Sequence, residues 1–153
     1  MSRDEIYYMK KAVAQARKAY AIDEVPVGAV LVDEQGAIVG TGYNQVEKKK
    51  QQQAHAEMIA IARAAKKRGD WRLNGCALYV TLQPCAMCMG LIQLSRISLL
   101  VYGCQSKLFG YQLDKEGAIQ LYNRDIAVQA GVLSDDAAQL LKQFFKQKRI
   151  RSG

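Results

Sequence analysis

One histidine, two cysteines and one glutamate form the most reactive combination in this sequence. His55 is the only histidine and Glu57 follows it by two positions, while Cys85 and Cys88 follow Pro84 with Cys-x-x-Cys spacing. An imidazole and two thiolates are zinc ligands, and three protein ligands leave the fourth tetrahedral position open, as in catalytic zinc sites. We therefore expect one Zn²⁺ per chain, bound by the histidine and the two cysteines beside a carboxylate.

The combined pattern His-x-Glu followed by Pro-Cys-x-x-Cys is the established signature of zinc-dependent nucleobase deaminases, and the roles of its residues are taken from that signature. Zinc lowers the pKa of a bound water toward about 7. Glu57 would accept the proton of this water and return it to the substrate, a task that suits a carboxylate because it can both take and give protons.

Each part of the pattern also has other interpretations. The Cys-x-x-Cys pair is compatible with a redox pair, with one half of a disulfide framework, or with a closed zinc site completed by Cys76 or Cys104. A thioredoxin-like context is not evident, and Cys76 and Cys104 lie in apolar, strand-like surroundings typical of small buried residues. The open zinc site is the interpretation that uses all four reactive residues.

Hydrophobic periodicity predicts the elements that must position these residues. Helices are expected at about 4–21, 55–68, 84–94 and 135–148, and strands at about 27–32, 37–43, 76–82, 97–102 and 126–128. Residues 105–122 are expected to be a loop with some helix. Strands that alternate with helices predict a single α/β layer domain over residues 1–153, built on a mixed sheet.

Both ligand groups fall at predicted helix starts. His55 and Glu57 would point to different sides of a helix interior, so His55 is expected at the helix boundary, where its dihedral angles can differ. Pro84 is expected at the first helical position, with both cysteines on one face of the first turn. Unsatisfied N–H groups at a helix start favour the thiolate form that binds metal.

Composition limits the classes of protein. The chain has 153 residues, half of them hydrophobic, and its 22 basic and 14 acidic side chains give a net charge of +8. No apolar run is long enough for a membrane span, and the charged N-terminus lacks a signal-peptide pattern, so a cytoplasmic protein is expected. The positive charge is compatible with a polyanionic partner.

With these residues in view, the chain resembles the bacterial tRNA-specific adenosine deaminases, a branch of the cytidine deaminase-like superfamily. The resemblance covers nearly the whole chain; its motifs are 24-EVPVGAV-30, 42-GYN-44, 54-AHAEM-58, 71-WRL-73, 78-LYVTL-82, 84-PCAMC-88, 95-SRI-97, 131-GVL-133 and 144-FF-145. It implies a three-layer α/β/α fold around a mixed five-stranded sheet, a homodimer, and conversion of adenosine to inosine at the wobble position of a tRNA anticodon.

The resemblance also implies roles for individual residues. His55, Cys85 and Cys88 would bind zinc and Glu57 would carry the proton. The substrate-binding residues would be Asn44, Val25, Pro26, Val27 and Ala56, although Asn44 taken alone is compatible with a turn residue. The expected contacts with the anticodon stem-loop are Lys107, Phe109, Tyr111, Lys146 and Arg149, with an aromatic ring stacking on a neighbouring base.

Three segments depart from the family pattern. Gln51–Gln53 replace an Asp-Pro-Thr sequence, Gln83 replaces a glutamate before the Pro-Cys pair, and Cys104–Tyr111 replace a loop that contacts the anticodon in the family. The metal-binding residues are unaffected, so the departures concern the nucleic-acid substrate.

Three other functions are compatible with the sequence. A free-base or nucleoside deaminase acting on guanine or cytidine would use the same chemistry, but a small neutral substrate gives no reason for the basic charge. Single-stranded DNA is a second possible substrate. A non-catalytic RNA-binding module with zinc is a third reading, and Glu57 argues against it because such a module has no use for a carboxylate at the open position.

Overall fold

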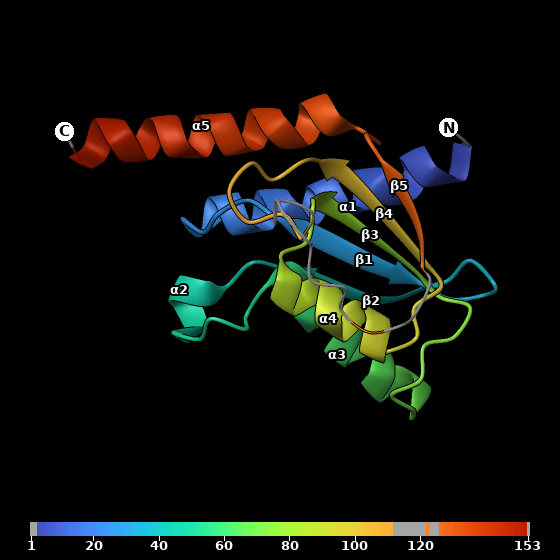
Figure 1. Cartoon of the computed structure of the whole chain (residues 1–153). Coiled ribbons are helices and arrows are strands. Elements are labelled where there is room, and N and C mark those ends of the chain that lie inside the picture. Colours follow the sequence, from blue (N-terminus) through green and yellow to red (C-terminus); the bar gives the residue numbers. More distant parts are fainter. Residues whose placement is uncertain (1–2, 112–121, 123–125, 153) are drawn as a thin grey trace.

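The computed structural model describes residues 3–111, 122 and 126–152. Its centre is a five-stranded sheet of order β2-β1-β3-β4-β5 (Figure 1). The strands are β1 (Gly28–Val32), β2 (Ile38–Tyr43), β3 (Ala77–Leu82), β4 (Leu99–Cys104) and β5 (Ala127–Ala130). β1 is antiparallel to β2 and β3, whereas β3, β4 and β5 run parallel. The predicted mixed sheet is confirmed.

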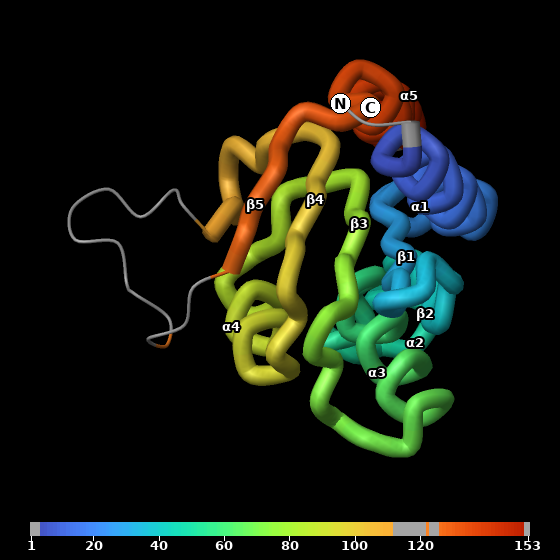
Figure 2. The backbone as a smooth tube through the Cα atoms, turned by 90° about the vertical axis from the view of Figure 1, so that its right-hand side faces the viewer, coloured from blue at the N-terminus to red at the C-terminus, as the bar shows by residue number. Residues whose placement is uncertain are grey.

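Helices cover both faces of the sheet. The long helices α1 (Arg3–Ala21) and α5 (Ser134–Ser152) lie on one face, and α3 (Ala56–Arg68) and α4 (Ala86–Leu94) lie on the other. Figure 2 shows the sheet between these two helical layers. A short helix, α2 (Val46–Lys49), lies between β2 and α3 in the chain. The three-layer α/β/α architecture expected from the sequence is therefore confirmed.

Alternating side chains of the central strands build a core on each face. In β1, Ala29 and Leu31 pack with the α3 and α4 layer, whereas Val30 and Val32 pack with α1. This follows from the period of two along a strand. Because both faces are covered, every residue of β1 is buried, and the strand reads as a continuous apolar run in the sequence.

The strand registers bring several chain segments to one edge of the sheet. Gly28, the first residue of β1, pairs with Tyr43, the last residue of β2. Ala29 pairs with Val80 of β3, and Leu82, the last residue of β3, pairs with Cys104, the last residue of β4. The start of β1 and the ends of β2, β3 and β4 therefore lie together, and the starts of α3 and α4 follow from this edge.

Two glycines in β2 allow α3 to lie directly against the sheet. A Cβ atom on Gly40 or Gly42 would overlap the carbonyl oxygens of Ala60 or Ala56, respectively. Only glycine allows the two backbones to approach so closely. This contact sets the distance between β2 and α3, the helix that carries Glu57.

The element boundaries differ from the sequence predictions in several places: β4 lies two residues later than predicted and β5 extends to Ala130. Helix α2 was not predicted, and α5 continues to Ser152 rather than ending near residue 148. The placement of Pro84 at the first helical position is wrong, because α4 begins at Ala86 and Cys85 is its N-cap. Residues 105–111 form turns and loop, and residues 112–121 of the predicted loop lie outside the described residues. None of the helices described is long and apolar enough to cross a bilayer.

Candidate active site

His55 is the N-cap residue of α3, which confirms its predicted place at the helix boundary. Its backbone is extended, with φ −79° and ψ 152°, while its carbonyl accepts the hydrogen bond of Ile59 at 3.1 Å. The extended dihedrals direct its imidazole away from the helical arrangement that Glu57, two residues later, adopts. Histidine and glutamate can therefore reach one site despite their spacing.

Cys85 has the equivalent position at the start of α4. Its backbone is also extended, with φ −75° and ψ 172°, and its carbonyl accepts a hydrogen bond from Met89 at 2.9 Å. Cys88 lies in the first turn and is completely buried. Neither His55 nor Cys85 makes a side-chain capping hydrogen bond, so both side chains are available to bind a ligand between the two helices.

The three predicted ligands converge. Nδ1 of His55 lies 3.3 Å from Sγ of Cys88 and 3.7 Å from Sγ of Cys85, and the three ligand atoms all lie within 4.8 Å of one another. Zinc bound tetrahedrally with Zn–S of about 2.3 Å and Zn–N of about 2.0 Å separates nitrogen from sulfur by about 3.5 Å. The donor set and its spacing therefore fit zinc.

The other two cysteines do not complete this cluster. Within the described part of the chain, the group that could hold a metal consists of His55, Cys85 and Cys88 alone. Cys76 and Cys104 are buried and free, and none of the four cysteines forms a disulfide. The alternatives of a closed four-ligand site and of a disulfide framework are therefore not realised in this fold.

Hydrogen bonding among the ligands favours ionised sulfur at Cys85 and keeps a proton on Cys88. The bond with Cys88 and, to a smaller extent, the bond with His55 lower the pKa of Cys85 to about 4, against the effect of burial. The hydrogen bond between the two cysteines and burial raise the pKa of Cys88, and the bond with Cys85 raises the pKa of His55. A site that holds protons between ligand atoms in this way can exchange them for a divalent cation.

Glu57 is buried beside the ligands, with 4% of its surface exposed. Burial raises the pKa of its carboxyl group, while its backbone hydrogen bond and the charge of His55 oppose this. A carboxyl group with a raised pKa can accept and release a proton closer to neutral pH than an exposed glutamate. The arrangement supports proton transfer next to the metal ligands.

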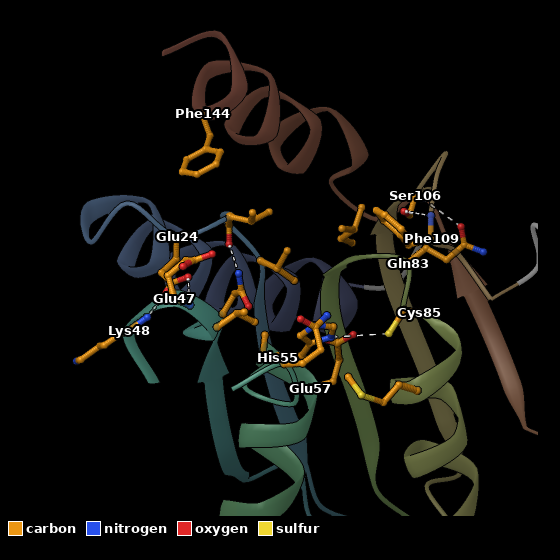
Figure 3. Close-up of a pocket in the computed structure, with 18 of the residues that line it drawn as sticks. Glu24, Glu47, Lys48, His55, Glu57, Gln83, Cys85, Ser106, Phe109 and Phe144 are labelled. Atoms are coloured by element: carbon orange, nitrogen blue, oxygen red, sulfur yellow. Dashed lines mark hydrogen bonds between the residues drawn. The ribbon is translucent and has the colours of Figure 1, made fainter. Parts of the chain in front are cut away.

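His55, Glu57 and Cys85 line a cavity of about 1360 Å³ and lie at its floor (Figure 3). One rim contains Glu24, Glu47 and Lys48, the opposite rim contains Gln83, Ser106 and Phe109, and Phe144 of α5 lies above. The cavity exceeds the roughly 300–1,000 Å³ of ordinary small-molecule pockets. It has room for more than one nucleotide unit.

The structure brings most of the predicted substrate residues to this cavity. Its lining includes His55, Glu57, Cys85, Val25, Val27, Asn44, Ala56 and Phe109. Asn44 donates a hydrogen bond from Nδ2 to the Val25 carbonyl at 3.3 Å, which fixes its side chain. Pro26 is buried and does not line the cavity, and neither do Lys107, Tyr111, Lys146 or Arg149.

Sequence reasoning missed one buried carboxylate at the rim. Glu24 is 2% exposed and accepts the backbone N–H groups of Glu47 and Lys48 at 3.1 and 2.8 Å. It thereby holds the start of α2 against the end of the loop after α1. A glutamate next to an apolar run gave a weak signal, but its partners, more than twenty residues away, could not be identified from the sequence.

Comparisons with known proteins agree with this geometry. Residues 2–104 match the family described as "Cytidine and deoxycytidylate deaminase zinc-binding region". The tRNA-specific adenosine deaminase of Bacillus subtilis (strain 168) is 40% identical over 151 residues, covering 97% of this chain and 92% of that protein.

Two solved structures share the fold. One, from a study of A-to-I editing by tRNA:A34 deaminases at the wobble position of transfer RNA, has a TM-score of 0.79 and 33% identity, covering 88% of this chain and 99% of that chain. The other, a guanine deaminase from Nitrosomonas europaea, has a TM-score of 0.80 and 27% identity, with coverage of 91% and 83%.

Proposed function

Because the chain belongs to the cytidine and deoxycytidylate deaminase family, we propose that it is a zinc-dependent enzyme that converts adenosine to inosine at the wobble position of a tRNA anticodon. The observation that carries this proposal is the convergence of His55, Cys85 and Cys88 beside the buried Glu57 at the floor of a large cavity. The choice of tRNA follows from relatives named as tRNA-specific adenosine deaminases that align over nearly the whole chain.

The reaction replaces the amino group at C6 of adenine by oxygen from water and releases ammonia. His55, Cys85 and Cys88 would hold a zinc ion, which would supply Lewis-acid chemistry that lowers the pKa of a water toward about 7. Glu57 would accept a proton from the attacking water as its oxygen bonds to C6, and deliver this proton to the ring nitrogen next to C6. It would then pass the second proton of that oxygen to the amine as the C6–N bond breaks and ammonia leaves. Its burial keeps bulk water away from the proton that it carries.

The walls of the cavity supply the base-binding surface in this proposal. Val25, Val27 and Ala56 offer apolar contacts to an extruded adenine, and Asn44 offers its amide oxygen because its Nδ2 donates to the Val25 carbonyl. Pro26, which is buried between the two valines, fixes the backbone of this segment. Bases of an anticodon loop are already splayed, so their entry requires no duplex opening.

The RNA backbone is proposed to lie outside the cavity. Lys107, Lys146 and Arg149 are the basic residues that we assign to phosphates, and their absence from the lining is compatible with this role. Phe109 is 74% exposed and lines the cavity, so it is better placed than Tyr111 to stack on a base. Tyr111 packs partly against the core and its hydroxyl is buried.

The remaining parts of the proposal concern the assembly and its setting. We propose a homodimer, a cytoplasmic location and a single deaminase domain over residues 1–153. Sedimentation of the purified protein tests the dimer, since a monomer at all concentrations would contradict it.

A substrate panel tests the proposed function. The protein should convert the wobble adenosine of an anticodon stem-loop to inosine, which sequencing reads as guanosine. Free adenosine, guanine, cytidine and single-stranded DNA should react at much lower kcat/KM. Because a guanine deaminase shares the fold, faster turnover of guanine than of the stem-loop would refute tRNA editing while leaving the zinc chemistry in place.

A further inference from the structure

The glutamine that precedes the Pro-Cys pair bonds to a loop far along the chain. Gln83 is 4% exposed, and its Oε1 accepts the backbone N–H of Ser106 at 3.2 Å. Its own backbone N–H donates to the Cys104 carbonyl at 2.8 Å. Gln83 therefore holds the chain where it leaves β4 and enters the loop of residues 105–111, which we call the β4 loop.

The β4 loop packs tightly on this side chain. A Cβ atom on Gly110 would overlap Oε1 of Gln83, so the loop backbone lies directly against the amide. Tyr111 closes the loop by donating its backbone N–H to the Pro84 carbonyl at 3.0 Å. The two ends of the loop are thus fixed to Gln83 and Pro84, next to the metal ligand Cys85.

A second bond within the loop directs its aromatic residue. Oγ of Ser106 accepts the backbone N–H of Phe109 at 3.2 Å. Gln83, Ser106 and Phe109 all line the cavity, on the rim opposite α2 (Figure 3). Phe109 is 74% exposed, so its ring is accessible to a base at the cavity mouth.

We propose that Gln83 is a positioning residue that, through Ser106, holds Phe109 at the cavity mouth as a stacking platform for the base next to the target adenosine. The inference rests on the proposed function and deepens it. It identifies the substrate as a polynucleotide with an unpaired neighbouring base, because a free nucleoside has nothing to place on the ring. The side-chain oxygen Oε1 of Gln83 is the atom that holds the β4 loop, because it accepts the Ser106 N–H.

A double-mutant cycle tests this on an anticodon stem-loop RNA. Phe109→Ala should lower kcat/KM by about tenfold, a typical effect of removing one base-stacking aromatic ring. Gln83→Leu, which removes the acceptor at similar volume, should cause a similar loss. Because Gln83 acts through Phe109, adding Gln83→Leu to Phe109→Ala should change kcat/KM by less than about twofold. Independent, multiplicative losses would overturn the proposal.

A second RNA separates positioning from general damage. Two stem-loops are needed, one with an abasic nucleotide before the target adenosine and one with an abasic nucleotide after it. On the RNA that lacks the base stacked on Phe109, wild type, Phe109→Ala and Gln83→Leu should have equal kcat/KM. Gln83→Glu, which retains an acceptor for the Ser106 N–H, should recover most of the activity lost in Gln83→Leu. Equal losses on intact and abasic RNA would show that Gln83 only supports the fold.

Matched controls lie in the same loop. Gln105 is exposed and does not line the cavity, and Leu108 is 80% exposed and does not line it either. Gln105→Leu and Leu108→Ala should leave kcat/KM on the stem-loop unchanged. A loss in Leu108→Ala as large as in Phe109→Ala would contradict the specific role of the phenylalanine.

A further variant tests the same link if Gln83→Leu cannot be interpreted, and the activity of the wild-type protein separates failure of this inference from failure of the proposed function. If Gln83→Leu loses zinc or unfolds, Ser106→Ala, which removes the acceptor for the Phe109 N–H, tests the same link without altering the neighbourhood of Cys85. It should cause a several-fold loss that vanishes in the Phe109→Ala background. A wild-type protein inactive on all RNA refutes the editing function, whereas active wild type with equally active Gln83→Leu refutes only this inference.

Discussion

At the residue scale, the proposed chemistry depends on a carboxylate that is kept out of water beside a cluster that could hold a metal ion. Glu57 is 4% exposed, and a buried carboxylate is costly unless its surroundings use or compensate its charge. Here the compensation comes from His55 and, when zinc is bound, from the metal. An isolated glutamate at this position in a non-catalytic protein would only destabilise it.

Glu57→Gln should lower the rate of deamination by about 10²–10⁴-fold, because the amide retains the volume but cannot transfer the proton. Zinc content should stay at one per chain, measured by elemental analysis. Asp135→Asn, an exposed change of the same kind at the start of α5, should leave activity unaltered. Activity of Glu57→Gln within tenfold of wild type would exclude the proton-transfer role.

Cys88→Ala should abolish stoichiometric zinc binding and activity, and should lower the temperature of unfolding, because metal binding and folding are coupled. Cys76→Ala provides the matched comparison, since Cys76 is equally buried but lies outside the ligand cluster. It should keep one zinc per chain and full activity. If Cys88→Ala retained one tightly bound zinc, the ligand assignment would be wrong.

At the scale of the elements, the site is made by two helix starts that meet at one edge of the sheet. His55 and Cys85 are both N-cap residues with extended backbones, and neither caps its own helix with its side chain. The partial positive charge at a helix N-terminus stabilises the thiolates that bind the metal. The position of α3 on β2, which decides whether His55 reaches the cysteines, depends on the glycines of β2.

Gly42→Ala should lower the free energy of unfolding by about 1–3 kcal/mol or more, because the new methyl group would overlap the Ala56 carbonyl at the start of α3. Displacement of α3 should also weaken zinc binding. Gly69→Ala is a useful comparison: its Cβ would meet nothing within 4 Å, and its φ of +73° costs only about 1–2 kcal/mol. Denaturant unfolding that ranks Gly69→Ala as the more damaging change would contradict the packing argument.

At the scale of the whole molecule, the cavity and the charge favour a large anionic substrate. The cavity of about 1360 Å³ has more room than a single base requires, and the net charge of +8 attracts phosphates along an approach path. A three-layer fold with one functional edge leaves the outer surfaces of α5 and the loops available for these contacts.

Salt should therefore separate RNA from small substrates. Raising the salt concentration from about 50 to 200 mM should reduce kcat/KM for the stem-loop steeply, because phosphate contacts release counterions. The slow deamination of free adenosine should change little under the same conditions. Equal salt dependence for both substrates would indicate that the basic residues do not contact the RNA backbone.

The sequence alone predicted the donor set and its metal, because ligand identity and spacing are local properties of the chain, whereas the reaction class followed from the deaminase signature and the family resemblance. It also gave the five strands and the four long helices, since periodicity reports burial. It did not locate α2 or the rim built by Glu24, and it placed Pro84 inside a helix that begins at Ala86. Short helices and long-range polar contacts leave no periodic trace.

The tertiary structure decided which segments meet. Residues near positions 24, 44, 57, 83, 106 and 144 form one cavity because the order β2-β1-β3-β4-β5 gathers the start of β1 and the ends of β2, β3 and β4 at one edge. The tertiary structure also exposes the ring of Phe109, packs Tyr111 partly against the core, and brings Gln83 into contact with the β4 loop. These features depend on strand register and on packing between distant residues. The free energy of the whole fold decides both, so they cannot be derived from any single segment of the sequence.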